Sequence, residues 1–311
     1  MAPTIVTFAN NKGGVGKTSL GTALVAAAAE RGQRCLVVDL DKQGNAAPRF
    51  GLEKHDDAND KGASMLGAVL LNQPLRAVTV RPHIDVGPGG AHAKDLAGQL
   101  FMRSGAEGVG ALAVLRDKIR EFAADRYDLV VIDTPVDTTI MTAALIAADW
   151  LVLPTKVDLD STESMAEVAE LFNGVRAKGL SNVELAGVVL FGVDPTATRL
   201  EAEMREYVNA LLGGTGACFA RTIRHSQVSS SGMRELGLSA SEYASQAAAQ
   251  EPWYKRRGKQ RDPEAHVFAS KGATANLAAD YEALMGEILD RIGMLAATTT
   301  SEPDTAEQAV G

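Results

Sequence analysis

A glycine-rich segment near the N-terminus constrains this chain more than any other feature of the sequence. It runs Lys12, Gly13, Gly14, Val15, Gly16, Lys17 and Thr18. The β-branched run Thr4–Ala9 precedes it, and a helical pattern follows that is stopped by Gly32. Glycines let backbone amides turn inward around an anion, and the N-terminus of a helix adds partial positive charge at the same point. The segment therefore predicts a phosphate-binding loop.

The side chains of this loop also fit nucleotide chemistry. We expect Lys17 to reach the β- and γ-phosphates and the Thr18 hydroxyl to ligate Mg²⁺. Ser19 follows in the first helical turn and is a further expected nucleotide contact. A plain glycine turn with two surface lysines is disfavoured, because three glycines and both lysines stand between a strand and a helix.

The same residues resemble the deviant phosphate-binding signature of the ParA/MinD class, and most of all that of ParA-type DNA-partitioning ATPases. In that variant the first glycine of the general pattern is often absent, and this chain has Asn11 there. The resemblance implies that Lys12 reaches the nucleotide of the opposite subunit in an ATP-dependent sandwich dimer. A charge supplied by the partner would then complete phosphate neutralisation only when two subunits meet.

Carboxylates follow the second predicted strand, Arg34–Asp39, in a segment Asp39-Leu40-Asp41-Lys42-Gln43-Gly44-Asn45. This segment resembles the family's D-x-D-P-Q-G-N stretch, with Lys42 in place of proline. By position, the resemblance implies that Asp41 orients or activates the attacking water and that Asp39 supports the Mg²⁺ shell. The alternative is a strand-end turn without catalytic function.

Three later residues complete the expected nucleotide site. The run Tyr127–Asp133 resembles a Walker B strand, which would deliver the Asp133 carboxylate to the metal's water shell. The segment around Asp194 resembles the family stretch that lies near the base. Arg224 stands in a Thr-Ile-Arg-His segment where relatives carry Ile-Pro-Arg-Asn. The resemblance thus implies nucleotide contacts from Asp194 and Arg224.

Short β-branched runs alternate with longer helical patterns along the chain, as in parallel α/β sheets. The predicted strands are Thr4–Ala9, Arg34–Asp39, Ile84–Val86, Asp128–Asp133, Trp150–Pro154, Val183–Phe191 and Cys218–Ile223. With the loop above, they predict an α/β P-loop NTPase three-layer fold, a mostly parallel twisted sheet flanked by helices. We expect one ATPase domain over 1–295, a basic insertion near 239–273, a last helix Thr274–Leu295, and a disordered polar tail over 296–311.

Charge restricts where nucleic acid could bind. Among 311 residues, 39 are acidic and 31 are Lys or Arg, so the formal charge of −8 argues against a surface that is basic all round. DNA binding would need a local patch, and the densest positive charge lies at Lys255, Arg256, Arg257, Lys259 and Arg261. The alternative is a solvated basic loop without a partner. Trp253 and Tyr254 are expected to anchor this loop by packing, because duplex DNA offers no unstacked base.

Together these features predict a slow, partner-stimulated ATPase with ATP and Mg²⁺ as cofactors, because the site has two lysines and one positioning carboxylate but no evident strong base. The resemblance implies a homodimer, a ParB-like centromere-binding partner and non-specific DNA. We expect a cytoplasmic, nucleoid-associated protein without integral membrane association, since no apolar run approaches about 20 residues. Because the sequence opens at its first strand, we also expect no N-terminal helix-turn-helix domain.

Four other uses of the same ATPase fold stay open at this point. A MinD-like membrane role needs a basic amphipathic last helix, whereas this one carries Asp280, Glu282, Glu287 and Asp290. An iron–sulfur role needs cysteines that meet across a dimer, but Cys35 and Cys218 both lie in strand-like runs. An amidating or ligating synthetase needs a substrate pocket that no motif identifies. Relatives that position other cargo share the whole signature.

Overall fold

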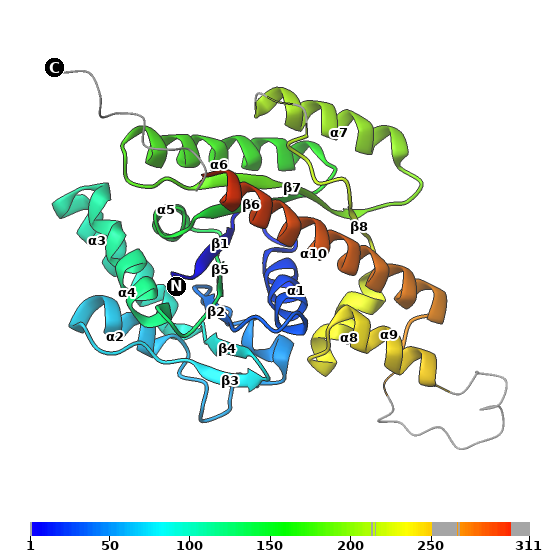
Figure 1. Ribbon diagram of the computed structural model, residues 1–311, viewed down its shortest axis with the longest axis horizontal. Coiled ribbons are helices and arrows are strands. Elements are labelled where there is room, and N and C mark those ends of the chain that lie inside the picture. Colours follow the sequence, from blue (N-terminus) through cyan, green and yellow to red (C-terminus); the bar gives the residue numbers. More distant parts are fainter. Residues whose placement is uncertain (1, 213, 215, 251–265, 267, 300–311) are drawn as a thin grey trace.

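The computed structural model describes residues 2–212, 214, 216–250, 266 and 268–299, and these form a three-layer α/β structure (Figure 1). One eight-stranded sheet has the order β3-β4-β2-β5-β1-β6-β7-β8. The strands are β1 (Thr4–Phe8), β2 (Cys35–Asp39), β3 (Val78–Arg81), β4 (Ile84–Gly87), β5 (Leu129–Asp133), β6 (Trp150–Thr155), β7 (Glu184–Val193) and β8 (Ile223–Arg224). Every neighbouring pair is parallel except β3 and β4. The predicted fold class is confirmed.

Helices cover both faces of the sheet (Figure 1). They are α1 (Lys17–Glu30), α2 (Ala63–Leu71), α3 (Ala91–Glu107), α4 (Ala113–Ala123), α5 (Thr138–Ala147), α6 (Leu159–Ala177), α7 (Thr198–Leu211), α8 (Gln227–Leu236), α9 (Ala240–Ala249) and α10 (Lys271–Thr299). Two 3₁₀ turns are also present: η1 (Ala47–Phe50) lies between β2 and α2, and η2 (Val109–Leu112) lies between α3 and α4.

The core consists of two apolar layers separated by the sheet. Successive residues of a strand point to opposite faces, so Ile5 packs with the layer that contains α2 to α7, and Val6 packs with the layer that contains α1 and α8 to α10. All five residues of β5 are buried, as expected for an inner strand covered on both faces. The sheet is therefore a rigid base for the loops at its carboxyl edge.

The structure differs from the sequence-based expectation at several elements. Strand β3, which we did not predict, forms an antiparallel hairpin with β4 at the sheet edge. The predicted strand Cys218–Ile223 is reduced to an isolated bridge at Cys218 and the short β8, because only these positions pair with β7. Within the predicted insertion 239–273, residues Ala240–Ala249 form a helix, which starts with a capping box between Ser239 and Glu242.

The last helix is longer than predicted, since α10 starts at Lys271 and ends at Thr299. The remainder of the predicted tail, 300–311, lies outside the described residues. Among the helices that are described, none is both long and apolar enough to cross a bilayer.

Candidate functional site

Loops at the carboxyl edge of the sheet enclose a cleft of about 590 Å³. Open α/β sheets bind their ligands at this edge. The phosphate loop, residues 13–19, forms one wall, and one face of α8 forms another. Asp41, Arg49, Thr134, Lys156, Phe191 and Arg224 also line the cleft. Six different strands thus contribute to one concave site.

The glycines of the loop are required by its backbone shape. Gly14 and Gly16 have φ angles of 71° and 95°, in the left-handed region that favours glycine. A Cβ on Gly16 would lie 2.6 Å from the ring of Phe191. Asn10 fixes the start of the loop, because its amide donates to the carbonyl of Pro154 at 2.8 Å and its side-chain oxygen accepts the N–H of Lys12 at 2.7 Å. The cradle is therefore preformed.

Lys17 lies beneath this cradle, with 8% of its surface exposed. Its ammonium donates to the carbonyls of Asn10 at 2.9 Å and Lys12 at 3.1 Å. An ammonium has three N–H donors, so one is left for a phosphate oxygen. Burial lowers the pKa of Lys17, whereas the charges of Asp133 and Asp41 act in the opposite direction.

Two buried carboxylates lie side by side below the loop, because Asp39 and Asp133 are register partners at the ends of β2 and β5. Neither oxygen of Asp133 has a hydrogen-bond partner within the described part of the chain. Burial raises the pKa of Asp133 to about 6, and the charge of Lys17 opposes that rise. Leaving a buried carboxylate unpaired costs free energy, so the site fits a cation such as Mg²⁺.

Asp39 is placed differently from Asp133. Its two oxygens accept the backbone N–H groups of Asp41 and Ala46, each at 2.9 Å. Burial, followed by the charge of Asp133, raises the pKa of Asp39 well above its ordinary value. Asp39 thus holds the loop that carries Asp41, and its place in a Mg²⁺ shell stays a prediction.

Asp41 lines the cleft and is partly exposed. Its Oδ1 accepts the N–H of Gln43 at 2.9 Å, and no described residue donates to its Oδ2. The backbone carbonyl of Asp41 accepts the N–H of Gly44 at 2.9 Å, which closes the turn with Lys42 in place of the proline. Asp41 therefore offers a free carboxylate oxygen to the cleft.

Lys12 turns away from Lys17 and contacts the start of α6. Its ammonium donates to Asp158 Oδ1 at 2.7 Å and to Ser161 Oγ at 3.3 Å, and it lies 3.7 Å from Asp160 Oδ2. The hydrogen bond to Asp158 raises the pKa of Lys12. The charge of the signature lysine is thus paired within its own subunit.

Comparison with known proteins agrees with this geometry. A family model described as an AAA domain matches residues 3–186. The chromosome-partitioning ATPase Soj of Thermus thermophilus is 32% identical over 210 residues, covering 65% of this chain and 76% of Soj. The chain belongs to the family of ParA-type partitioning ATPases.

Solved structures support the ParA-type fold. McdA of Cyanothece, solved as a variant in complex with ATP, aligns with a TM-score of 0.69 at 16% identity, covering 94% of this chain and 97% of McdA. Cobyrinic acid a,c-diamide synthase of Mycobacterium smegmatis, solved with ADP and magnesium, aligns with a TM-score of 0.60 at 21% identity, covering 80% and 98% of the two chains. At these identities the likeness concerns the fold alone.

Asp194 and Arg224, the two later residues expected to contact the nucleotide, differ in their position relative to the cleft of this ParA-type chain. Asp194 does not line the cleft; its Oδ1 accepts the N–H and the hydroxyl of Thr196 at 2.8 and 2.7 Å, so it closes its own turn. Arg224 does line the cleft, but its guanidinium makes a bidentate pair with Asp280 of α10 at 2.5 and 2.8 Å. Both residues therefore have a structural partner, and their nucleotide contacts stay predictions.

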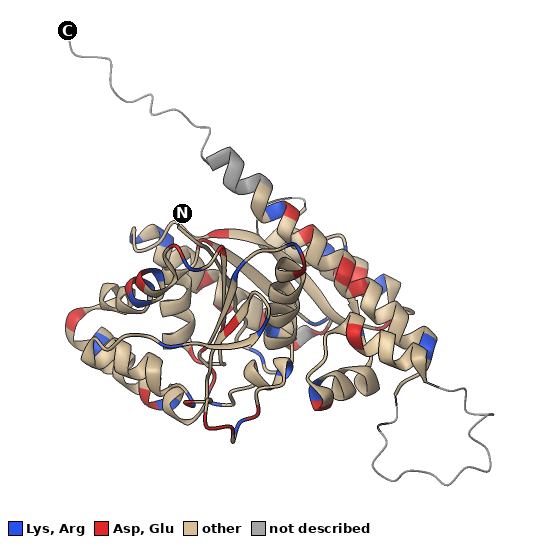
Figure 2. Ribbon diagram, turned by 60° about the horizontal axis from the view of Figure 1, so that its bottom comes forward, with Lys and Arg blue, Asp and Glu red and all other residues tan. Residues whose placement is uncertain are grey.

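Three basic residues of the cleft were missed by the sequence analysis. Arg49, Lys156 and Arg234 line it, and the ammonium of Lys156 lies 3.7 Å from the position of a Cβ on Gly14. None of them belongs to a motif, and only the folded chain brings them to the ParA-type loop. The predicted DNA contacts, Lys255, Arg256, Arg257, Lys259 and Arg261, lie outside the described residues. Elsewhere, basic and acidic residues are interspersed over the described elements (Figure 2).

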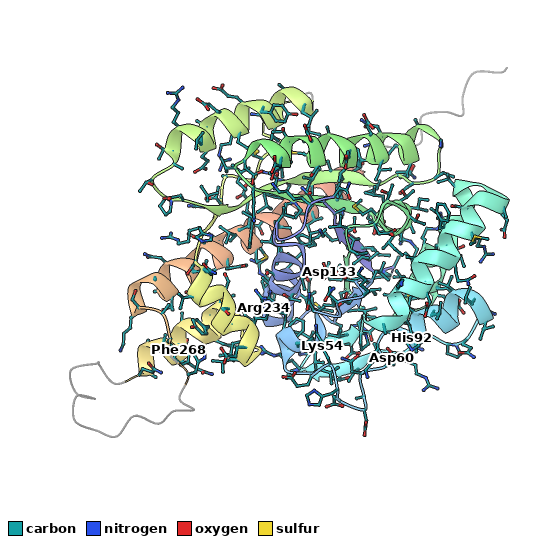
Figure 3. The ribbon with its side chains drawn as sticks, turned by 180° about the vertical axis from the view of Figure 1, so that it is seen from behind. Lys54, Asp60, His92, Asp133, Arg234 and Phe268 are labelled. Atoms are coloured by element: carbon teal, nitrogen blue, oxygen red, sulfur yellow. The ribbon has the colours of Figure 1, made fainter. Side chains whose placement is uncertain are left out.

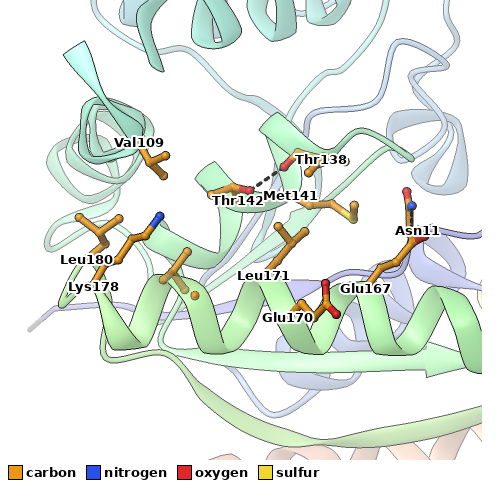
Figure 4. A pocket seen from close by; sticks show the side chains of 12 residues that line it. Asn11, Val109, Thr138, Met141, Thr142, Glu167, Glu170, Leu171, Lys178 and Leu180 are labelled. Atoms are coloured by element: carbon orange, nitrogen blue, oxygen red, sulfur yellow. Dashed lines mark hydrogen bonds between the residues drawn. The ribbon is translucent and has the colours of Figure 1, made fainter. Parts of the chain in front are cut away.

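A second pocket, of about 510 Å³, lies between α5 and α6 next to the ParA-type loop. Met141, Leu171 and Leu180 contribute apolar surface, and Glu167 and Glu170 contribute carboxylates (Figure 4). Asn11 links this pocket to the phosphate loop, because its amide donates to Glu167. The position where the general pattern has glycine is thus used to fasten the loop to α6.

Proposed function

We propose that this protein is an ATPase that dimerises on binding ATP, binds DNA without sequence preference, and segregates plasmid or chromosomal DNA with a ParB-like partner. The observation that carries the proposal is the preformed loop with Lys17 beneath it and the unpaired, buried Asp133 beside it. Soj, the relative with 32% identity, is itself named a chromosome-partitioning ATPase. McdA was solved with ATP, and the diamide synthase with ADP and magnesium.

ATP and Mg²⁺ are the proposed cofactors. The amides of residues 13–19 would hold the phosphates, and Lys17 would offer its remaining N–H to them. Thr18 and Asp133 would hold Mg²⁺, which neutralises charge on the phosphates when it is bound. The free oxygen of Asp41 would accept a hydrogen bond from the attacking water and so orient it. Because Asp41 only orients the water and the motif residues include no strong base, hydrolysis is expected to be slow without a partner.

Lys12 makes dimerisation depend on nucleotide in this proposal. In the single chain its charge is satisfied by Asp158. Leaving that partner costs free energy unless another anion replaces it, and a phosphate in the opposite subunit would do so. ATP on both subunits therefore favours the exchange. Two DNA-binding patches then act together, which raises avidity without a new contact. Such a dimer would be cytoplasmic and associated with the nucleoid.

A DNA mobility-shift assay tests this function. Wild type is compared with a variant in which Lys255, Arg256, Arg257, Lys259 and Arg261 are changed to alanine, with ATP, with ADP, and at two salt concentrations. We expect ATP-dependent, sequence-independent binding by wild type that weakens steeply with salt and is lost in the variant. Equal binding by both proteins would place the DNA surface elsewhere. No binding by wild type would contradict the partitioning function.

A further inference from the structure

Arg49 is a cleft residue for which the ATPase motifs assign no role. It lies in η1, eight residues after Asp41, and its Nη2 donates to the Ser19 hydroxyl at 2.9 Å. Its Nε is buried and has no hydrogen-bond partner within the described residues. Burial lowers the pKa of Arg49, whereas Tyr281 and the more distant charge of Asp133 act in the opposite direction, and no described carboxylate lies within ion-pair distance of its guanidinium. A partly buried guanidinium without a counter-ion costs free energy.

Arg234 reaches the same cleft from α8. Gln227, Ser230, Ser231 and Arg234 all line the cleft, and their spacing of three and four residues puts them on one face of α8. Figure 3 labels Arg234 on this helix and Asp133 at the end of β5. Arg234 is exposed and makes no ion pair with a described residue. The positive charge of Arg234 repels that of Arg49 and lowers the pKa of Arg49.

Two arginines around one cleft, both without carboxylate partners among the described residues, form a site for an anion. Ser19 indicates which anion this is. Lys17 and Thr18 serve the β- and γ-phosphates and the metal, whereas the amides at the start of the helix cradle the α- and β-phosphates. Ser19 follows Thr18 in the first turn of α1, so the hydrogen bond to Ser19 holds Arg49 beside the amides at the start of this helix.

We propose that Arg49 and Arg234 clamp the α-phosphate of the bound nucleotide, Arg49 from η1 beside Ser19 and Arg234 from the cleft-facing side of α8. The clamp rests on nucleotide binding by the phosphate loop and adds a second binding element that is separate from the motif. It acts on a group that ATP and ADP share. It therefore raises the affinity for both nucleotides and slows the release of ADP, without discriminating between them.

Calorimetric titration with ADP and with a non-hydrolysable ATP analogue, both with Mg²⁺, tests the clamp. The variants are Arg49→Gln, Arg49→Lys and Arg234→Gln, with Arg116→Gln as the control, since Arg116 pairs with Asp117 away from the cleft. Losing a charge-assisted hydrogen bond is expected to raise Kd roughly tenfold or more. Arg49→Gln and Arg234→Gln should weaken both nucleotides by the same factor. Arg49→Lys should recover part of the loss, and the control should bind as wild type.

A loss confined to the ATP analogue would overturn the clamp, because it would place the arginines at the γ-phosphate. Unchanged ADP affinity in Arg234→Gln would also overturn it. Because Arg234 is exposed, its replacement should change nucleotide binding without changing the stability of the fold. Replacement of the partly buried Arg49 is expected to affect the stability of the loop as well. Thermal unfolding of the nucleotide-free variants is measured alongside, and Arg234→Gln should unfold at the wild-type temperature. Failure of wild type to bind ADP would overturn the phosphate-loop assignment together with the clamp.

Discussion

Lys17 is the side chain on which nucleotide affinity depends most in this account. Its ammonium already donates to two carbonyls of the loop, so it shapes the cradle and would also offer its remaining N–H to the ligand. We expect Lys17→Ala to abolish measurable nucleotide binding in calorimetry. Lys94→Ala, which removes an exposed lysine of α3, should bind as wild type. Retained ATP affinity in Lys17→Ala would remove the phosphate-loop assignment.

Asp41 is expected to act on hydrolysis and not on binding. Removing a water-positioning carboxylate raises the barrier while the phosphate contacts persist. Asp41→Ala should therefore bind ATP normally but release phosphate about a hundredfold more slowly. Asp57→Ala, at an exposed position of a surface loop, is the control. A wild-type rate of ATP hydrolysis in Asp41→Ala would show that another residue positions the attacking water.

Asp158 is expected to restrain Lys12 in the single chain. Asp158→Asn keeps an N-cap oxygen for the Ser161 N–H but removes the charge that pairs with Lys12. Less ATP should then be needed for half-maximal dimerisation, as measured by light scattering. Asp160→Asn should have a smaller effect, because Asp160 lies 3.7 Å from the ammonium and Asp158 lies 2.7 Å from it. Identical ATP dependence in wild type and Asp158→Asn would refute the restraint.

Local spacing explains which site residues could be predicted. Lys17 and Thr18 belong to one short loop, and Asp133 ends an apolar strand, so their chemistry can be read from neighbouring residues. Arg49 and Arg234 enter the cleft from η1 and α8, whose positions depend on tertiary packing. For Asp194, in contrast, the family resemblance predicted a nucleotide contact, but in the structure its side chain closes a turn.

At the scale of elements, α8 lines the cleft and α9 packs against α8. Their packing is close at Gly232, where an added Cβ would lie 2.3 Å from the Tyr243 hydroxyl. Both residues are buried. The position of α8, and with it that of Arg234, therefore depends on glycine at 232.

Gly232→Ala is expected to destabilise the fold by about 1–3 kcal/mol, because overpacking forces neighbouring groups to shift. It should also weaken ADP binding by displacing α8. Urea denaturation and ADP titration measure the two effects. Gly98→Ala is the control: nothing lies within 4 Å of its Cβ position in α3, so alanine there should stabilise the helix by roughly 0.5–1 kcal/mol. Unchanged stability of Gly232→Ala would contradict the packing argument.

The elements that the sequence analysis missed have weak local signals. β3 has only four residues and lies at the sheet edge, where pairing with β4 decides its conformation. α9 is rich in Ala, Ser and Gln, so its periodicity is poor, and its docking against α10 becomes evident only in the folded chain. The inner strands were predictable, because burial on both faces produces the continuous apolar runs of β5 and β6.

At the scale of the whole molecule, a charge of −8 predicts that the proposed DNA binding by a single chain is weak, because a local patch would neutralise few phosphates. In the proposed function, ATP controls this binding through the association of subunits. We propose that Lys12 links nucleotide binding to this association, because its ammonium pairs with Asp158 in the single chain and would exchange that partner for a phosphate. We therefore expect ATP to produce a dimer through Lys12.

Light scattering of the Asp41→Ala protein with ATP and Mg²⁺ tests this claim most directly, because slow hydrolysis holds the ATP-bound state. We expect a mass near twice the 32.7 kDa of one chain. With ADP, or when Lys12→Ala is added to the same protein, the mass should be that of one chain. An ATP-induced dimer of equal stability with and without Lys12→Ala would contradict the account.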